Sequence, residues 1–298
     1  RRKSSAGIAI FRSTSENSMG SNSIFSNLTA ENTAAEISLL LSADFKRKKT
    51  VVLLEGEDDV KAFRFLFDKS VTLIKAYGAS TTIDKFLPAE FPDEPRVIGI
   101  RDRDYQTEKR FARIFYCDGC CCETMLVKDD ETFERVVVNF YRGKTPPMRL
   151  RYEILRSLFP ISAIRLCSDR YKWALKVSGT DLSRVIRPGK TTPVSEAVAF
   201  VNAYNRKNEI KGERLKKLAA VRDPGRVEDY LMITNGHDLV AAMRIYFDRA
   251  SGDHRSVGDK TLSSALRCSY SREAFRSTDL CRALKTYAAN HNLTIVAE

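Results

Sequence analysis

The sequence predicts an α/β fold in which a parallel sheet is flanked by helices and is followed by a mainly helical domain. Two apolar runs, at 51–54 and 97–100, have the continuous hydrophobicity of strands that are buried on both faces. Helical patterns lie between the candidate strands, and this alternation is typical of parallel strands joined by right-handed crossovers. Beyond residue 145 strand signals become rare and helical patterns dominate.

Apolar spacing and turn-forming residues locate the individual elements. A first helix is expected to begin between residues 29 and 32, because Ala34, Ile37 and Leu41 recur at helical spacing. Further helices are expected to begin near Asp58 and near residue 80. The candidate strands are 50–56, 71–77, 96–100 and 113–117, and the remaining candidate helices are 130–140, 149–158, 193–205, 239–247 and 280–289.

Composition divides the chain into three predicted parts. Residues 1–30 are rich in Ser and Asn and are expected to be a flexible tail. Within it, residues 1–18 precede the first methionine, Met19, and are left out of the functional prediction as a candidate vector-derived remnant. A Lys-Thr-Pro-Pro sequence at 144–147 then separates a predicted α/β domain, 31–145, from a predicted helical domain, 146–298.

Acidic residues follow two of the candidate strands. The sequence Glu-Gly-Glu-Asp-Asp occupies 55–59, and Asp102 and Asp104 follow the strand at 96–100. If both strands belong to one parallel sheet, their carboxyl ends meet at the same edge, and Glu55, Asp102 and Asp104 converge. Carboxylate oxygens are the ligands that Mg²⁺ prefers, so the sequence predicts a magnesium site and chemistry on phosphates.

Each of these motifs also has a simpler interpretation. Residues 57–59 suit the negatively charged first turn of a helix, so Asp59 is predicted to cap that helix or to support the site from outside. Asn235 and Gly236 precede an apolar helix and predict a turn with an N-cap, which makes a catalytic His237 the weaker alternative. For Trp173, base stacking is conceivable, but burial in a core is the commoner role.

Charge and cysteine content limit the classes of function. The formal net charge is +12 and the isoelectric point is about 9.4, which suits a polyanionic partner such as nucleic acid. The seven cysteines show no disulfide framework, and the Cys-x-x-Cys pair of Cys117 and Cys120 lacks a second pair for zinc. Since no apolar window reaches the length of a membrane span, we expect a cytoplasmic protein without membrane contact.

The order and spacing of the acids resemble the Toprim domain of topoisomerases, primases and several nucleases. Glu55-Gly56 at one strand end, followed by Asp102-x-Asp104 at another, carries this resemblance over about residues 48–140. It implies that Glu55 is catalytic and that Glu55, Asp102 and Asp104 bind Mg²⁺ or Mn²⁺. Toprim proteins often have a small residue between the aspartates, where this chain has Arg103; that difference weakens the resemblance to topoisomerases and primases and leaves the nuclease branch open.

Within that branch, residues 54–60 and 102–105 look closest to the Toprim effector nucleases of the PARIS anti-phage system, which are relatives of the OLD nucleases. The segment 121–126 resembles a later part of such proteins and adds Glu123 to Asp59 as an additional candidate site residue. The resemblance implies a toxic bacterial endonuclease that cleaves transfer RNA in abortive infection. It also implies an ABC-type ATPase sensor that releases the nuclease, and we expect a homodimer in the active state.

Three alternatives remain open at this point. One is a non-catalytic module of the same fold that binds a metal or a partner, and a second is a DNA-cleaving nuclease of the OLD type. The third, a primase or topoisomerase, would require a further domain such as a zinc ribbon, for which the sequence shows no pattern. Fold resemblance does not decide between these activities.

Overall fold

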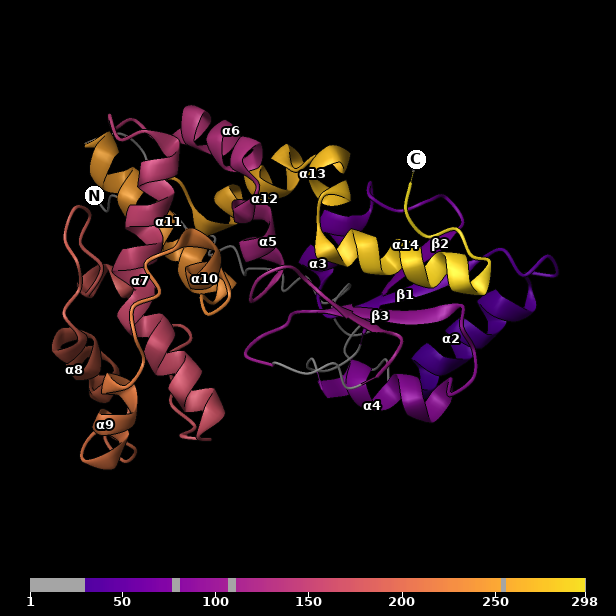
Figure 1. Ribbon diagram of the computed structural model, residues 1–298, viewed down its shortest axis with the longest axis horizontal. Coiled ribbons are helices and arrows are strands. Elements are labelled where there is room, and N and C mark those ends of the chain that lie inside the picture. The colour runs from indigo at the N-terminus through magenta and orange to yellow at the C-terminus, as the bar shows by residue number, and fades with distance from the viewer. Residues whose placement is uncertain (1–29, 77–80, 107–110, 253–255, 298) are drawn as a thin grey trace, which may run out of the picture.

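A computed structural model describes residues 30–76, 81–106, 111–252 and 256–297, so the predicted tail at 1–30 lies outside the described residues except for Ala30. Its centre is a four-stranded, all-parallel sheet with the strand order β2-β1-β3-β4, flanked by helices (Figure 1). The predicted α/β class with a parallel sheet is therefore confirmed. The strands are β1 (Thr50–Leu54), β2 (Val71–Lys75), β3 (Val97–Arg101) and β4 (Ile114–Tyr116).

The apolar runs form the two central strands because both of their faces are covered. Every residue of β1 and β3 is buried. Alternate side chains point to opposite faces, so Val51 and Leu53 join one hydrophobic cluster while Val52 and Leu54 join the other. Figure 1 shows α2 (Ala30–Ser42) and α4 (Thr81–Glu90) on one side of the sheet, with α3 (Glu57–Phe63) and α14 (Asp279–His291) on the other.

One glycine allows α4 to lie close to the sheet. A Cβ atom on Gly99, in the middle of β3, would lie 2.5 Å from Ile83 Cγ2 and 2.9 Å from Leu87 Cδ1. Both of these side chains are fully buried on α4. A residue with a side chain at position 99 would therefore push the helix away from the strand.

The remaining helices pack together beside the sheet. The longest, α7 (Pro147–Arg170), contacts most of the others in this group. It continues through Pro160, whereas the sequence predicts an end at residue 158. The other members are α5 (Cys122–Lys128), α6 (Asp130–Phe140), η1 (Leu182–Arg184), α8 (Val194–Tyr204), α9 (Glu213–Ala219), α10 (Val227–Leu231), α11 (Gly236–Ser251), α12 (Asp259–Ser269) and α13 (Arg272–Arg276).

The last helix returns to the sheet. Tyr287 of α14 packs edge-on against Phe115 of β4, with 5.5 Å between ring centroids. The buried Asp118 carboxylate accepts hydrogen bonds of 3.0 Å from the backbone N–H groups of Asp279 and Leu280, which begin α14. A single hydrophobic cluster runs from the sheet through the helical group to residue 295. The predicted boundary between an α/β domain and a helical domain at 145/146 stays a prediction. Residues 279–297, which the prediction assigned to the helical domain, pack against the sheet.

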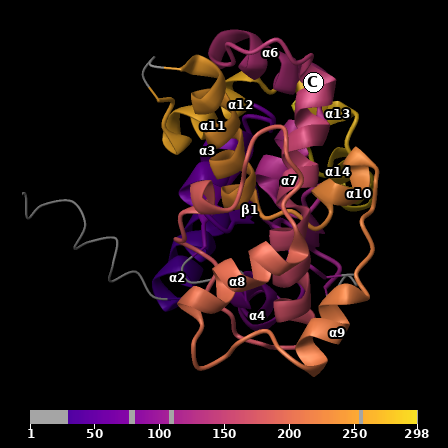
Figure 2. The same ribbon diagram turned by 90° about the vertical axis from the view of Figure 1, so that its left-hand side faces the viewer.

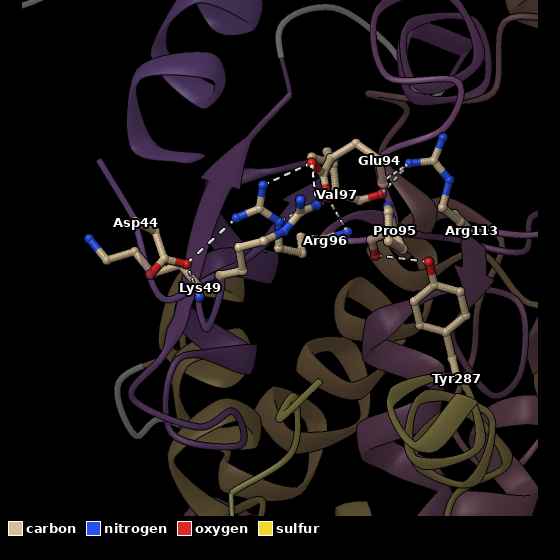
Figure 3. A network of polar contacts seen from close by, with 9 residues as sticks. Asp44, Lys49, Glu94, Pro95, Arg96, Val97, Arg113 and Tyr287 are labelled. Atoms are coloured by element: carbon tan, nitrogen blue, oxygen red, sulfur yellow. Dashed lines mark hydrogen bonds and ion pairs between the residues drawn. The ribbon is translucent and has the colours of Figure 1, made fainter. Parts of the chain in front are cut away.

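A polar network holds the amino-terminal edge of the sheet (Figure 3). Arg96 pairs with Glu94 at 2.8 Å and with Asp44 at 3.6 Å. The buried Arg113 donates to backbone carbonyl groups before and within β3, including that of Val97 at 3.0 Å. Tyr287 adds a hydrogen bond of 2.8 Å to the carbonyl of Pro95, so this edge also anchors α14.

None of the helices in the described part of the chain combines the length and the hydrophobicity that crossing a membrane requires.

We predict that Gly99→Ala lowers the free energy of unfolding by about 1–3 kcal/mol, because the added methyl group overpacks the contact between β3 and α4. Urea unfolding measures the change. The matched control is Ile83→Ala, which removes the nearest clashing atom, so Gly99→Ala should cost less in that background. Equal costs in the two backgrounds would contradict the proposed clash.

Candidate metal centre

The pairing of the two central strands, β1 and β3, places the first two carboxylates of the site side by side. Leu54 pairs with Ile100, so Glu55 and Asp102, which follow β1 and β3, emerge at the same carboxyl edge. Two further carboxylates join them: Asp59 from the first turn of α3, and Glu123 from the first turn of α5. Their charges act on one another, since Asp59, Glu55 and Glu123 all raise the pKa of Asp102. These four side chains are called the acidic cluster below.

Asp102 is the most strongly affected member of the acidic cluster. Burial, followed by the three neighbouring carboxylates, raises the pKa of Asp102 well above its usual value. One contact opposes this shift: Asp102 Oδ1 accepts a hydrogen bond of 2.9 Å from the backbone N–H of Cys122, at the start of α5. The carboxylate is therefore held in place by a helix N-terminus while its charge remains unfavourable.

Asp59 has two roles at once. Its Oδ2 accepts a hydrogen bond of 2.9 Å from the backbone N–H of Gly56, so it caps α3 as the sequence predicts. It also belongs to the acidic cluster, because burial and then the charge of Glu123 raise the pKa of Asp59 to about 6. A capping role alone does not account for its place among three other carboxylates.

A buried arginine separates Asp104 from this group. Arg101, the last residue of β3, is 2% exposed. Its Nη2 lies 3.2 Å from Asp104 Oδ2, its Nε lies 3.1 Å from Glu55 Oε1, and its Nη1 lies 2.5 Å from Asp84 Oδ2. Asp104 itself has a left-handed backbone with φ of 50°, and its side chain is 44% exposed. The structure thus brings Asp104 to Arg101 and leaves Asp102 with Asp59 and Glu123.

Glu55 lies between these two environments. Burial raises the pKa of Glu55 to about 7, Arg101 opposes that shift, and the charges of Asp104 and Asp59 add to it. Burial also raises the pKa of Asp104, again against the effect of Arg101. Glu55 Oε1 is buried and accepts no hydrogen bond in the described part of the chain, although the ion pair with Arg101 reaches it. It can therefore take up and release a proton near neutral pH.

The sequence prediction gave Arg101 and Asp84 no place in the site, and it described the segment at Asn235 and Gly236 only as a turn with an N-cap. Arg101 has a signal in the sequence, a charged residue that ends an otherwise apolar run, whereas Asp84 on α4 has none. At the start of α11, a Cβ atom on Gly236 would lie 2.1 Å from Glu123 Oε2 and 2.7 Å from Cys121 Sγ. Asn235 caps this helix as predicted, and His237 is exposed in its first turn.

Cysteines line the inner side of the acidic cluster. Cys117, Cys120, Cys121 and Cys122 are all buried, and none of the described cysteines forms a disulfide, as the sequence predicts. Burial, then the charges of Glu123 and Asp102, raise the pKa of Cys121 well above its usual value. Thiols in this environment stay protonated in the metal-free protein, so they add no negative charge to the acidic cluster.

The donor chemistry of the acidic cluster fits a hard divalent cation. Its potential ligands are carboxylate oxygens. Burial and the neighbouring charges favour the protonated form of Asp102, and a bound cation would displace that proton. With the side chains as they stand, no group of three or more His, Cys, Asp or Glu residues in the described part of the chain is arranged to hold a metal ion. Asp59, Asp102 and Glu123 are the residues that would hold Mg²⁺ or Mn²⁺, with Glu55 beside them, whereas Asp104 is engaged by Arg101.

Comparison with known proteins adds no relative: no protein-family model matches this chain, and no curated protein sequence matches it.

We predict that the metal-free protein loses stability as pH rises from about 4.5 to about 7. Glu55 has a pKa of 4.5 in its unperturbed state and about 7 in the fold, so the folded protein binds more protons in this window and is favoured at its acidic end. Thermal unfolding in EDTA measures the effect. Glu55→Gln, which cannot ionise, should flatten the dependence, and identical pH profiles of the two proteins would contradict the assignment.

Proposed function

We propose that this protein is a metal-dependent endonuclease of the Toprim type that hydrolyses phosphodiester bonds in RNA. The observation that carries the proposal is the convergence of Glu55, Asp59, Asp102 and Glu123 at the carboxyl edge of a parallel sheet, where burial and neighbouring carboxylates raise the pKa values of Glu55, Asp59 and Asp102. Ligand sites of open parallel sheets lie at this edge. The order of the acids along the chain and the all-parallel sheet are compatible with a Toprim domain.

The residues of the site have different roles in such a reaction. Asp59, Asp102 and Glu123 would hold the cation, which when bound supplies positive charge to the phosphoryl oxygens and makes an attacking water more acidic. Glu55, with its pKa of about 7, exchanges a proton with the reacting groups at neutral pH. Arg101 fixes the orientation of Glu55 through the contact between Nε and Oε1 and keeps Asp104 away from the acidic cluster.

Substrate and biological role follow from charge and from the resemblance. The net charge of +12 suits a nucleic-acid substrate, because phosphates are attracted to the body of the protein around the acidic site. We propose RNA, with transfer RNA as the target, and a role as the toxic effector of a bacterial anti-phage system. In that role an ABC-type ATPase partner restrains a cytoplasmic nuclease whose active form is a homodimer.

We predict that Glu55→Gln and Asp102→Asn each reduce cleavage by about 10²-fold or more, because they remove the proton carrier and a cation ligand. The assay follows purified protein with transfer RNA, single-stranded DNA and duplex DNA in Mg²⁺ or Mn²⁺. Glu90→Gln is the matched control, since Glu90 is exposed at the far end of α4.

The outcomes separate the alternatives. Cleavage of DNA but not RNA, with the same dependence on Glu55, would keep the nuclease and change its substrate. Metal binding that stabilises the protein without cleavage of any of the three substrates would instead identify a non-catalytic module. Cleavage that survives both substitutions would place the catalytic site elsewhere.

A further inference from the structure

A basic surface with one exposed aromatic ring lies at the end of α7, apart from the acidic cluster. It is built by the last residues of that helix, by the turn that follows it, and by the segment before and within α9. We call it the basic platform. Its members are Arg170, Tyr171, Lys172, Lys176, Arg206, Lys207, Arg214 and Lys217.

The turn after α7 is held in an unusual conformation. Lys172 and Ala174 both have left-handed backbones, with φ of 52° and 53°, and they flank the buried Trp173. Such conformations are unfavourable for residues with side chains and persist only where surrounding contacts impose them. Here the amide of Asn205 bridges both sides of Lys176, accepting from its N–H at 2.7 Å and donating to its carbonyl at 2.9 Å. The two segments of the basic platform are therefore locked together.

The conformation of this turn presents Tyr171 to solvent. The Tyr171 ring stacks on Trp173 with 5.8 Å between centroids and an interplanar angle of 22°, yet Tyr171 is 40% exposed. The ammonium of Lys217 lies 4.3 Å from the Tyr171 centroid, and Arg214 lies 5.6 Å from that of Trp173. A nucleobase can take the place over Tyr171 that Lys217 holds, while the ammonium turns to a phosphate.

Most of the charge of the basic platform is not neutralised by ion pairs, although Lys172 pairs with Asp169 at 3.4 Å. Between residues 206 and 217 there are six basic and two acidic residues. The two acids, Glu209 and Glu213, pair with Lys211 at 3.4 Å and Lys216 at 3.6 Å, neither of which belongs to the basic platform. No ion pair reaches Arg206, Lys207 or Lys217 from the described residues, and the first two are exposed. This excess of positive charge favours a polyanionic partner.

Helix α7 links the basic platform to α11, the helix that begins against the acidic cluster. Asp169 lies in the last turn of α7. One turn earlier, Arg165 forms two hydrogen bonds, of 2.5 and 2.8 Å, with Asp238 of α11, the helix that begins against Glu123. The helical rise puts about 9 Å between Arg165 and Tyr171. Figure 2 shows α8 and α9 beside this end of α7.

We propose that the basic platform binds an unpaired segment of RNA, with one base stacked on Tyr171 and the adjoining phosphates on Arg206, Lys207 and Lys217. This inference rests on the proposed function for its choice of RNA. An unpaired segment is required because the bases of a double helix are stacked on one another and cannot reach a protein ring. The surface would hold a loop of the substrate while the neighbouring phosphodiester bond enters the acidic cluster.

Binding in EDTA tests the proposal without any cleavage. The measurement is the fluorescence anisotropy of a labelled RNA hairpin with an unpaired loop, titrated with the full chain. Tyr171→Ala should weaken binding about tenfold, and Tyr171→Phe, which keeps the ring, should bind as the wild type does. Arg206→Ala with Lys207→Ala should lower the slope of log affinity against log salt by about 0.7 for each phosphate that the variant no longer neutralises.

Lys46→Ala with Lys48→Ala is the matched control, because it removes two exposed charges that precede β1 at the opposite edge of the sheet. The proposal fails if Tyr171→Ala binds normally, if the control changes affinity as much as the Arg206 and Lys207 pair, or if DNA of the same sequence binds more tightly through Tyr171. The Arg206 and Lys207 pair is exposed, so it tests the surface even if Tyr171→Ala loosens the turn.

The test also distinguishes this proposal from the nuclease assignment. Glu90→Gln should bind the hairpin as the wild type does, because Glu90 is exposed on α4 and lies outside both the acidic cluster and the basic platform. Platform-dependent binding without cleavage of any nucleic acid would remove the nuclease assignment and leave the RNA-binding surface. The opposite result is also possible: cleavage depends on Glu55, but neither Tyr171→Ala nor the Arg206→Ala and Lys207→Ala pair changes RNA binding. That result would keep the nuclease assignment and reject the basic platform as an RNA-binding surface.

Discussion

The arrangement of the candidate site depends on the buried guanidinium of Arg101. A charged group that is 2% exposed is unfavourable unless it is paired, and Arg101 meets this requirement with carboxylates from three elements: Glu55 after β1, Asp84 on α4 and Asp104 after β3. Removing it would leave several acids uncompensated in a poorly solvated region. The same contacts that make the charge tolerable therefore connect the two central strands to the helix that covers one face of the sheet.

Arg101 also divides the acids into two sets with different chemistry. Asp104 is on its compensated side, where the guanidinium opposes the effect of burial on its pKa. Asp59, Asp102 and Glu123 are on the other side, where burial and mutual repulsion act together on Asp102. A cation is the group that relieves that repulsion, so the uncompensated set is the one suited to bind it. The charges of both Asp104 and Asp59 act on Glu55, so Glu55, the proposed proton carrier, lies between the two sets.

Much of the sheet and its edge can be predicted from the sequence, because the determining signals are local. Continuous apolar runs identify β1 and β3, and parallel pairing then places Glu55 and Asp102 at one edge. The partners of Arg101 cannot be predicted this way, because Asp84 lies on a helix whose position against β3 depends on the close approach at Gly99. The true length of α7 was hidden by Pro160, which ends a helix by local rules but is tolerated here in a buried interior.

The acidic cluster is completed by helices that are far apart in the sequence. The first backbone N–H groups of α3 and α5 meet Asp59 and Asp102, and α11 begins at Gly236 directly against Glu123. Helix N-termini favour negative charge, so they oppose the burial and repulsion that favour protonation. Burial raises the pKa of Asp59 to about 6 against the hydrogen bond from Gly56, and it raises the pKa of Glu55 to about 7 against the charge of Arg101. Because α11 belongs to the helical part of the chain, that part packs against the site, although all four carboxylates come from residues 31–145.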